Sequence, residues 1–438
     1  MEQLKQLYAA WAGVACEECV PLGANGSSRR YYRLTSAEAR SAIGCIADDV
    51  RENEAFFAYS RHFRAKGLSV PELYAIDDDR RHYLQQDLGD LTLYGLLQEK
   101  KRQGGGFDAQ MFDLYRQALA HLADFQLAGR DLDYSVAYPR PAFDRRSILW
   151  DLNYFKYYFL KLKHIPFDEE LLENDFDQLV QQLLSADDNY FMYRDFNPRN
   201  IMLVGGEQPT PYFIDYQGGR RGASQYDVAS LLYSAQSNLP DAIRLQLLNH
   251  YLDARHFSVP ERQQWLDHFW RYLLVRILQT LGAYGYRGLY ERKEYFLQSI
   301  PLALNNLRTL LESHPPQHLP HLSQVLAYLV QSAPQPVAPA PGPLTVQILS
   351  FSYKQGLPTD LSGNGGGFIF DCRALPNPGR YEQYKSYTGQ HPSVIAFLQK
   401  EDSVAQFIHQ AADIVIPSIN KYIERHFTHL QIAFGCTG

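Results

Sequence analysis

Residues 193–202 read YRDFNPRNIM, and an apolar run then leads to FIDY at residues 213–216. Asp195 and Asn200 stand five positions apart in a polar loop, and Asp215 follows at the end of a short predicted strand. Phosphoryl transfer from a magnesium nucleotide needs one carboxylate to accept a hydroxyl proton and a pair of oxygen ligands for the metal. We therefore predict that Asp195 orients or deprotonates an acceptor hydroxyl, while Asn200 and Asp215 bind Mg²⁺. A structural Asp and Asn in a turn is the alternative, and the second acid on a strand favours the catalytic interpretation.

Three phrases carry a resemblance to a known family. They are RDFNPRN at residues 194–200, DYQ at 215–217 leading through Gly222 to QYDVASLL at 225–232, and SRRYYRL at 28–34. The family is that of the aminoglycoside phosphotransferases and choline kinases. Within it, the chain most resembles the anomeric kinases of N-acetylmuramate and N-acetylglucosamine, which act in cell-wall sugar recycling.

This resemblance covers about residues 5–330 of the sequence. It implies an α+β, protein-kinase-like bilobal fold, with a small β-rich lobe followed by a helical lobe. It also implies that ATP and Mg²⁺ are the cofactors, that they bind in the cleft between the lobes, and that a small hydroxylated molecule is the acceptor.

The composition excludes several other classes of protein. The 438 residues suggest two or three domains. A net charge of −6 and a pI near 6.2 argue against a general nucleic-acid or membrane-surface binder. The sequence has no run of about eighteen apolar residues, and its N-terminus lacks the apolar core of a signal peptide. Five cysteines do not make a disulfide framework in a chain of this length, so we expect a cytoplasmic protein.

Proline and glycine mark the organisation of the chain. Residues 331–343 contain five prolines together with alanine and glycine, which predicts a semi-rigid linker. Before the linker, residues 1–90 alternate short β-type runs with one helix at 53–66, whereas residues 91–330 are mostly helical. This order predicts a small kinase-like lobe followed by a large one. Residues 344–438 then form a separate C-terminal α/β domain.

A loop with glycines and serines, GANGSSRR at residues 23–30, lies between two β-type segments. Phosphate oxygens could accept hydrogen bonds from the backbone amides of this loop and from the side chains of Ser27, Ser28, Arg29 and Arg30. An ordinary glycine-bearing hairpin fits the composition equally well. The family resemblance favours contact with the nucleotide phosphates.

The strand that carries the nucleotide-binding lysine in kinases of this kind reads SAIGCIAD here, at residues 41–48, and contains no lysine. Glu54, on the following helix, is the carboxylate that we expect beside the nucleotide, but its usual cationic partner is missing. Arg29, Arg30 or Arg33 is the alternative source of this positive charge.

The segment QQDLGD at residues 85–90 ends the small lobe. In the family this linker presents main-chain groups to adenine, so the resemblance implies that Gln86, Asp87 and Leu88 contact the base through their backbone. A turn with a helix cap is a second interpretation of the same residues, and the two interpretations are compatible.

The resemblance also indicates which residues lie near the acceptor. PAFDRR at residues 141–146 matches a segment close to the acceptor in the sugar kinases, which makes Asp144 and Arg145 candidate substrate ligands. Arg194 and Arg199 complete the catalytic candidates. Arg199 is placed to meet the γ-phosphate or a substrate carboxylate, such as the lactyl group of muramic acid.

Beyond the linker, LTVQILSF at residues 344–351 predicts a buried strand, and LQIAFGCTG at 430–438 predicts a strand that runs into a loop with glycine and threonine. These residues resemble the C-terminal domain of the RNase adapter (RapZ-like) family, whose best-known members sense glucosamine-6-phosphate. Because the family continues past this loop, we expect the domain to be truncated here. The candidate sugar-phosphate ligands are Lys354, Arg373, Gly435, Cys436, Thr437 and Gly438.

RNA binding, the other activity of the adapter family, finds little support in the sequence. From residue 344 onward, seven Lys and Arg residues stand against seven Asp and Glu residues. A neutral domain lacks the basic face that a phosphate backbone requires.

The leading hypothesis is an ATP- and Mg²⁺-dependent kinase that phosphorylates the anomeric hydroxyl of N-acetylmuramate or N-acetylglucosamine, with an appended domain that senses an amino-sugar phosphate. A kinase of choline, homoserine or an aminoglycoside is one alternative. Choline and aminoglycosides favour a strongly acidic acceptor pocket, whereas the segment 141–146 is basic. An inactive nucleotide-binding scaffold is the other alternative, which the missing lysine suggests and which Asp195, Asn200 and Asp215 oppose.

Overall fold

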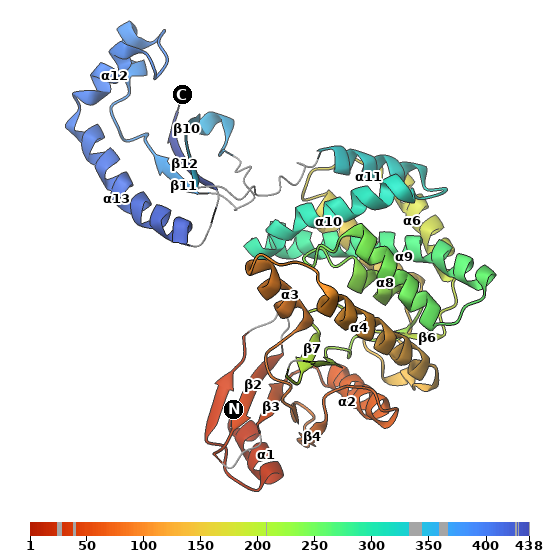
Figure 1. Cartoon of the computed structure of the whole chain (residues 1–438). Coiled ribbons are helices and arrows are strands. Elements are labelled where there is room, and N and C mark those ends of the chain that lie inside the picture. The colour runs from red at the N-terminus through yellow and green to blue at the C-terminus, as the bar shows by residue number, and fades with distance from the viewer. Residues whose placement is uncertain are drawn as a thin grey trace. The chain divides into compact units, whose positions relative to one another are not determined.

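The computed structural model describes residues 1–23, 29–37, 41–206, 208–332, 344–358, 367–424, 427 and 429–437. The chain divides into two compact units (Figure 1), one of Met1–Arg292 with Ser299–Pro334 and one of Gln335–Gly438 with Lys293–Gln298. Among the residues singled out above, Ser27, Ser28, Gly438 and residues 333–343 of the predicted linker lie outside the described residues.

An antiparallel sheet forms the N-terminal lobe of the first unit. Its strands, in spatial order, are β1 (Glu18–Pro21), β2 (Arg30–Thr35), β3 (Ala42–Ile46), β5 (His82–Gln86) and β4 (Leu73–Ile76). β3 is buried along its whole length because it pairs with β2 on one side and β5 on the other, and because helix α1 (Glu2–Ala12) packs on the sheet through Leu4 and Tyr8.

Helix α2 (Val50–Ala65) connects this sheet to the rest of the unit. It begins three residues before the predicted helix at 53–66, because the side chain of Asp49 accepts hydrogen bonds from the backbone N–H groups of the first turn. Its aromatic side chains face both lobes. Phe57 packs edge-on against Tyr83 of β5, with 5.3 Å between the ring centres. Phe63 packs against Phe191 of the helical lobe, with 4.8 Å between the ring centres.

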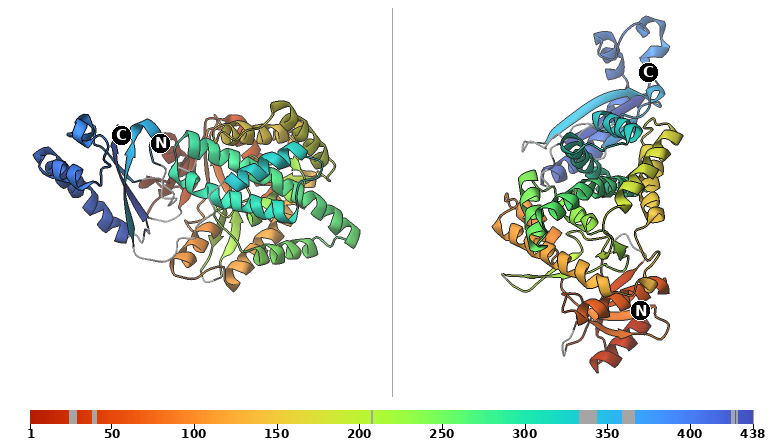
Figure 2. Two further views of the ribbon diagram at one scale, coloured as in Figure 1. Left: turned by 90° about the horizontal axis from the view of Figure 1, so that it is seen from above. Right: turned by 90° about the vertical axis from the view of Figure 1, so that its right-hand side faces the viewer.

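The helical lobe follows in the sequence, as predicted, and the two lobes can be traced in all three views of Figures 1 and 2. Its α-helices are α3 (Leu93–Arg102), α4 (Ala109–Ala128), α5 (Arg145–Phe155), α6 (Glu169–Leu184), α7 (Gln225–Leu232), α8 (Asp241–Ala254), α9 (Val259–Tyr284), α10 (Glu294–Ser313) and α11 (Pro320–Ser332). Two short antiparallel pairs, β6 (Tyr190–Met192) with β9 (Arg220–Gly222) and β7 (Ile201–Val204) with β8 (Thr210–Phe213), lie between α6 and α7 in the chain.

The long helix α9 packs against both α5 and α7. It continues into a π-helical turn, η4 (Gly285–Tyr290), which lies against a second π-helical turn, η3 (Lys156–Leu160). A Cβ atom on Gly285 would lie 1.9 Å from the carbonyl oxygen of Tyr158. Only glycine therefore permits this close approach of the two backbones.

The second unit contains a parallel sheet with the strand order β10 (Thr345–Ser352), β12 (His429–Cys436) and β11 (Phe368–Asp371). Helices α12 (Pro392–Gln399) and α13 (Asp402–Glu424) lie between β11 and β12 in the chain. Val415 of α13 packs with Leu430 and Ile432 of β12. The carboxyl ends of the three strands share one edge of the sheet, because all three run in the same direction.

The predicted α+β class is confirmed, with a β-rich lobe before a helical lobe and a small α/β region at the C-terminal end. Among the helices that the structure describes, none is both long enough and apolar enough to cross a membrane.

Candidate active site

The two short strand pairs of the helical lobe position the residues that the sequence singled out. The loop 193–200 connects β6 to β7, and Asp215 follows β8. Because β7 pairs with β8, the backbone N–H of Ile214 donates to the carbonyl of Asn200 at 3.1 Å. The end of the loop and the residue after the strand are thereby held side by side.

The predicted triad of Asp195, Asn200 and Asp215 is brought together. The side-chain nitrogen of Asn200 donates to Oδ2 of Asp215 at 3.1 Å and to the backbone carbonyl of Asp195 at 2.9 Å. Gln217 donates to the other carboxylate oxygen of Asp215 at 2.7 Å. The Asp195 residue itself is exposed, so an acceptor molecule can approach its carboxylate.

The electrostatics of this cluster suit a divalent cation. Burial and the negative charge of Asp195 raise the pKa of Asp215 to about 6, against the hydrogen bond from Gln217 and the charge of Arg29. Two neighbouring carboxylates are stabilised by a cation between or beside them, and Asn200 adds an oxygen-bearing side chain. The donor set therefore fits Mg²⁺, with Asn200 and Asp215 as the residues that would hold it.

Among the described residues, no group of three or more His, Cys, Asp and Glu side chains could hold a metal. Mg²⁺ in nucleotide-dependent enzymes is commonly held by one or two carboxylates, with phosphate oxygens and water as the remaining ligands.

The loop itself is held in an unusual backbone conformation. Arg194 has a φ of 75° and Asp215 a φ of 69°, which is the left-handed region that side-chain-bearing residues rarely adopt. Asp227 of α7 supports the first of these residues, because its carboxylate accepts from the backbone N–H groups of Tyr193 at 2.7 Å and of Arg194 at 2.9 Å. Burial raises the pKa of Asp227 to about 7, against the effect of these two hydrogen bonds.

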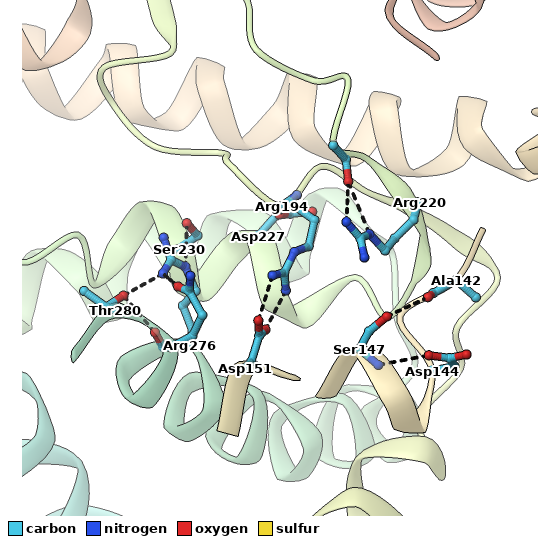
Figure 3. A network of polar contacts seen from close by, with 12 residues as sticks. Ala142, Asp144, Ser147, Asp151, Arg194, Arg220, Asp227, Ser230, Arg276 and Thr280 are labelled. Carbon is cyan, nitrogen blue, oxygen red and sulfur yellow. Dashed lines mark hydrogen bonds and ion pairs between the residues drawn. The ribbon is translucent and has the colours of Figure 1, made fainter. Parts of the chain in front are cut away.

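The side chain of Arg194 forms a largely buried ion pair. It donates two hydrogen bonds to Asp151 of α5, at 2.8 and 3.0 Å (Figure 3). Its guanidinium also lies over the rings of Phe143 and Tyr226, at 4.9 and 4.8 Å from the ring centres. We predicted a catalytic role for Arg194. These contacts instead support a role in positioning the loop that carries Asp195.

A second guanidinium, that of Arg220 on β9, is buried in the same region (Figure 3). It donates to the carbonyl of Gly218 at 3.1 and 3.2 Å. Burial and the positive charge of Arg194 lower the pKa of Arg220 to about 10. No local sequence pattern marked Arg220 as a site residue.

The remaining catalytic candidate, Arg199, is an exposed residue. Its guanidinium donates to Gln236 at 2.9 Å and lies over the ring of Tyr94 on α3 at 3.9 Å. The structure thus turns Arg199 towards α3, and a contact with substrate or phosphate stays a prediction.

In the N-terminal lobe, the structure pairs the charged residues in a way that the sequence did not show. Glu54 forms an ion pair with Arg80, so the expected partnership with a cation near the nucleotide is not what the structure shows for this residue. The carboxylate that faces Arg29 is Glu52, at 3.5 Å. Arg30 is exposed at the start of β2.

The linker between the lobes combines both interpretations that the sequence allowed. The backbone N–H of Gln86 donates to the carbonyl of Glu72 at 2.8 Å. The carboxylate of Asp87 accepts from the backbone of Gly89 at 3.0 Å and from Arg33 at 2.7 Å, whereas Leu88 is buried. The side chain of Asp87 therefore has a structural partner, and a backbone contact of residues 86–88 with adenine stays a prediction.

The two acceptor candidates have local structural partners. Asp144 is the N-cap of α5, where it accepts from the backbone N–H of Ser147 at 3.0 Å and pairs with Arg140. Arg145 pairs with Asp177 at 2.6 Å, and both residues are exposed. These contacts neither bring the two residues to the triad nor test their predicted contact with substrate.

In the second unit, most of the predicted sugar-phosphate ligands lie at the carboxyl edge of the parallel sheet. Arg373 follows β11, pairs with Asp371 at 2.6 Å and lies over the ring of Tyr353 at 4.2 Å. Lys354 follows β10, whereas Gly435 and Cys436 are the last residues of β12 and the exposed Thr437 comes next. This edge is where ligands commonly bind in parallel sheets.

Five residues near the site were not candidates from the sequence. They are Glu52, Tyr83, Asp151, Gln217 and Arg220. Gln217 was the easiest of these to predict, because it stands only two positions after Asp215 and its side chain can turn back to that carboxylate. Asp151 carried no local signal, since its partner Arg194 is 43 positions away.

Comparison with known proteins identifies the family of this chain. Residues 18–273 match the model of the phosphotransferase enzyme family, APH, and residues 344–438 match that of the RapZ C-terminal domain. The chain therefore belongs to the phosphotransferase enzyme family. It is a small-molecule phosphotransferase of the protein-kinase-like fold, with a RapZ C-terminal domain appended.

Individual relatives of both parts are known. The N-acetylmuramate/N-acetylglucosamine kinase of Neisseria meningitidis is 28% identical over 65% of this chain and 83% of that protein, and the kinase of the same name from Pseudomonas aeruginosa is 27% identical over 75% and 94%. A nucleotide-binding protein of Koribacter versatilis is 32% identical over 22% of this chain and 29% of that protein. The solved choline kinase LicA from Streptococcus pneumoniae aligns with 70% of this chain and 98% of that chain, at 16% identity and a TM-score of 0.46.

Proposed function

We propose that this phosphotransferase is an ATP- and Mg²⁺-dependent amino-sugar kinase that phosphorylates the anomeric hydroxyl of N-acetylmuramate or N-acetylglucosamine. The observation that carries the proposal is the contact between Asn200 and Asp215 beside an exposed Asp195. The relatives with the name N-acetylmuramate/N-acetylglucosamine kinase support the choice of acceptor.

Each member of the triad has a defined task in this reaction. Asp195 accepts the proton of the sugar hydroxyl as its oxygen attacks the γ-phosphorus, while the bond to the β,γ-bridging oxygen breaks and ADP leaves. Asn200 and Asp215 hold the cation, which when bound neutralises charge on the phosphate oxygens. Arg194 keeps Asp195 in place through Asp151.

Arg199 is our candidate for a contact with the γ-phosphate or with the lactyl carboxylate of N-acetylmuramate. Its planar guanidinium would suit either anion through two parallel hydrogen bonds. Replacement by lysine would keep the charge and lose this geometry. A larger loss of activity with N-acetylmuramate than with N-acetylglucosamine would assign Arg199 to the carboxylate.

The decisive experiment is a coupled ADP-release assay on the full chain, with amino sugars, choline, homoserine and aminoglycosides as acceptors. The position of the phosphate is then read by phosphorus NMR, and Asp195→Asn serves as the inactive control. We expect an acid-labile sugar 1-phosphate. A sugar 6-phosphate, or turnover of choline alone, would overturn the anomeric assignment, and the absence of turnover with every acceptor would favour a nucleotide-binding scaffold.

For the C-terminal region we propose binding of an amino-sugar phosphate at the carboxyl edge of the parallel sheet. The convergence of Arg373, Lys354 and the backbone of Gly435 at this edge supports the proposal. Calorimetry of the full chain with glucosamine-6-phosphate, glucosamine and a nucleoside triphosphate is the test, with Arg373→Ala as the matched variant. Binding of the sugar phosphate that Arg373→Ala weakens is the expected result, and binding of the nucleotide alone would contradict it.

A further inference from the structure

In this chain, a residue other than a lysine on β3 must supply any positive charge that the N-terminal lobe brings to the nucleotide. β3 (Ala42–Ile46) is buried along its whole length and carries Gly44 and Cys45 where a phosphate-pairing lysine is expected. A triphosphate held without any cation from the N-terminal lobe would keep much of its charge uncompensated on that side.

Arg29, at the entry to β2, brings a cation to this place from the neighbouring strand. Its side chain is only 2% exposed. One terminal nitrogen donates to the hydroxyl of Tyr83 on β5 at 2.8 Å, and the other lies 3.5 Å from a carboxylate oxygen of Glu52 on α2. The guanidinium also lies 6.0 Å from the centre of the Phe56 ring.

The strand register brings this guanidinium beside β3. Arg30 pairs with Ile46, and Cys45 pairs with Tyr31 on one side and with Tyr83 on the other. Because Arg29 donates to the hydroxyl of Tyr83, the cross-strand partner of Cys45, its charge lies next to the strand that would otherwise carry the lysine.

Packing also connects Arg29 to the proposed metal ligand of the helical lobe. Phe56, whose ring centre lies 6.0 Å from the guanidinium of Arg29, stacks on the ring of Tyr216 with 5.3 Å between the ring centres. Tyr216 directly follows Asp215 in the chain. Glu54, two positions after Glu52 on α2, is instead occupied by Arg80.

We infer that Arg29, held by Glu52 and Tyr83, is the N-terminal-lobe cation that contacts the nucleotide phosphates, in place of a lysine on β3. This inference rests on the proposed function, because it assigns a residue to the binding of ATP. It also assigns to Glu52, and not to Glu54, the task of positioning that cation.

A purely structural role is the competing explanation, since Arg29 also joins β2 and β5 to α2. The two roles differ in what they do to nucleotides of different charge. A cation that contacts phosphate changes the affinity for ATP and ADP and leaves adenosine binding intact. A structural defect of the lobe weakens all three alike.

The experiment is calorimetry of the full chain with Mg·AMP-PNP, Mg·ADP and adenosine, together with KM and kcat for ATP. Arg29→Met keeps the length of the side chain and removes its charge, Arg29→Lys keeps a charge, and Glu52→Gln is compared with Glu54→Gln on the same helix. Thermal melting establishes that each variant folds. In the Arg29→Met background, Cys45→Lys returns a cation to the usual strand.

We expect Arg29→Met to lower the affinity for Mg·AMP-PNP about 10- to 100-fold, the loss that removal of a charge-assisted hydrogen bond produces, with adenosine affinity unchanged. Arg29→Lys should recover part of this loss, Glu52→Gln should raise KM for ATP, and Glu54→Gln should leave it unchanged. Recovery by Cys45→Lys would further support the inference.

The outcomes separate the inference from the proposed function. If the wild-type chain binds no Mg·AMP-PNP, both are overturned. If it binds and Arg29→Met binds equally well, or loses adenosine in the same proportion, the inference is wrong and the kinase proposal stands. If Arg29→Met does not fold, then Arg29→Lys and the comparison of Glu52→Gln with Glu54→Gln decide in the same way.

Discussion

Asp215→Asn should make the ligand-free protein more stable while it abolishes Mg²⁺-dependent nucleotide binding. The substitution is nearly isosteric. It also suits the backbone, because Asp215 has a φ of 69° and asparagine tolerates the left-handed region at least as well as aspartate. The new side chain can still accept the hydrogen bond from Gln217.

The expected change in the free energy of unfolding follows from the pKa of Asp215, which is about 6 in the folded protein against the ordinary value of 3.8. As the pH rises above the ordinary value, the unfolded chain releases this proton first, so ionisation of Asp215 lowers the stability of the fold until the folded carboxyl is also ionised. The difference of about two pKa units corresponds to about 3 kcal/mol at neutral pH. Loss of the contact with Asn200 costs about 1 kcal/mol, which leaves a net gain of about 2 kcal/mol.

The measurement is urea denaturation at about pH 4, 6 and 8, either with a chelator and no nucleotide or with Mg·ATP and no chelator. The transition to follow is the one that Mg·ATP shifts in the wild-type protein. We expect Asp215→Asn to be slightly less stable than the wild type at the lowest pH and more stable at the highest, because only the wild type carries the ionising carboxylate. Mg·ATP should stabilise the wild type alone.

Two results would refute this reasoning. A variant that is less stable than the wild type by the same amount at every pH would mean that burial does not disfavour the Asp215 carboxylate. A variant that Mg·ATP stabilises as strongly as it does the wild type would remove Asp215 from the metal site. Asn200→Asp, which adds a carboxylate beside Asp215, is a useful counterpart, and we expect it to destabilise the ligand-free protein.

Three further predictions address the reacting group, the loop support and the packing of the helical lobe. Asp195→Asn should lower kcat by about 10²–10⁴, the usual contribution of a positioned general base, and should leave the affinity for Mg·ATP within a few-fold in calorimetry; an unchanged kcat would remove Asp195 from the reaction. Asp151→Ala leaves the guanidinium of Arg194 buried without its partner, so chemical denaturation should show a loss of about 3–5 kcal/mol, and a loss below 1 kcal/mol would contradict the assigned role. Gly285→Ala should destabilise the fold by about 1–3 kcal/mol, because its Cβ would lie 1.9 Å from a backbone oxygen. Gly106→Ala, which has nothing within 4 Å of its new Cβ, is the matched control for thermal melting.

Much of the candidate site could be predicted because its members are close in sequence. Asp195 and Asn200 belong to one loop, and a single strand pair brings Asp215 beside Asn200. Because the loop and the strand pair are short, the pairing of β7 with β8 is enough to place these three residues next to one another. The residue types in the motif therefore indicated phosphoryl transfer before any tertiary contact was known.

The ion pair of Glu54 with Arg80 shows what such reasoning could not reach. Positions 52 and 54 are about 200° apart around a helix, so their side chains point to opposite sides of α2, and only Glu52 lies beside Arg29. The rotation of α2 about its axis is determined by its cap at Asp49 and by the packing of its aromatic side chains between the two lobes. That packing involves partners far along the chain and could not be derived from the helix alone.

Residue types at fixed spacing, namely an acid, an amide and a second acid, indicated the chemistry of this protein, and the hydrophobic pattern indicated the order of its β-rich and helical parts. The pairing of the surrounding charges, in contrast, depended on the folded chain. Folding turned Arg194 onto Asp151, Glu54 onto Arg80 and Arg29 onto Glu52. The physical reason is that a charged side chain pairs with whichever opposite charge the packing brings within reach, and packing depends on contacts between segments that are distant in the chain.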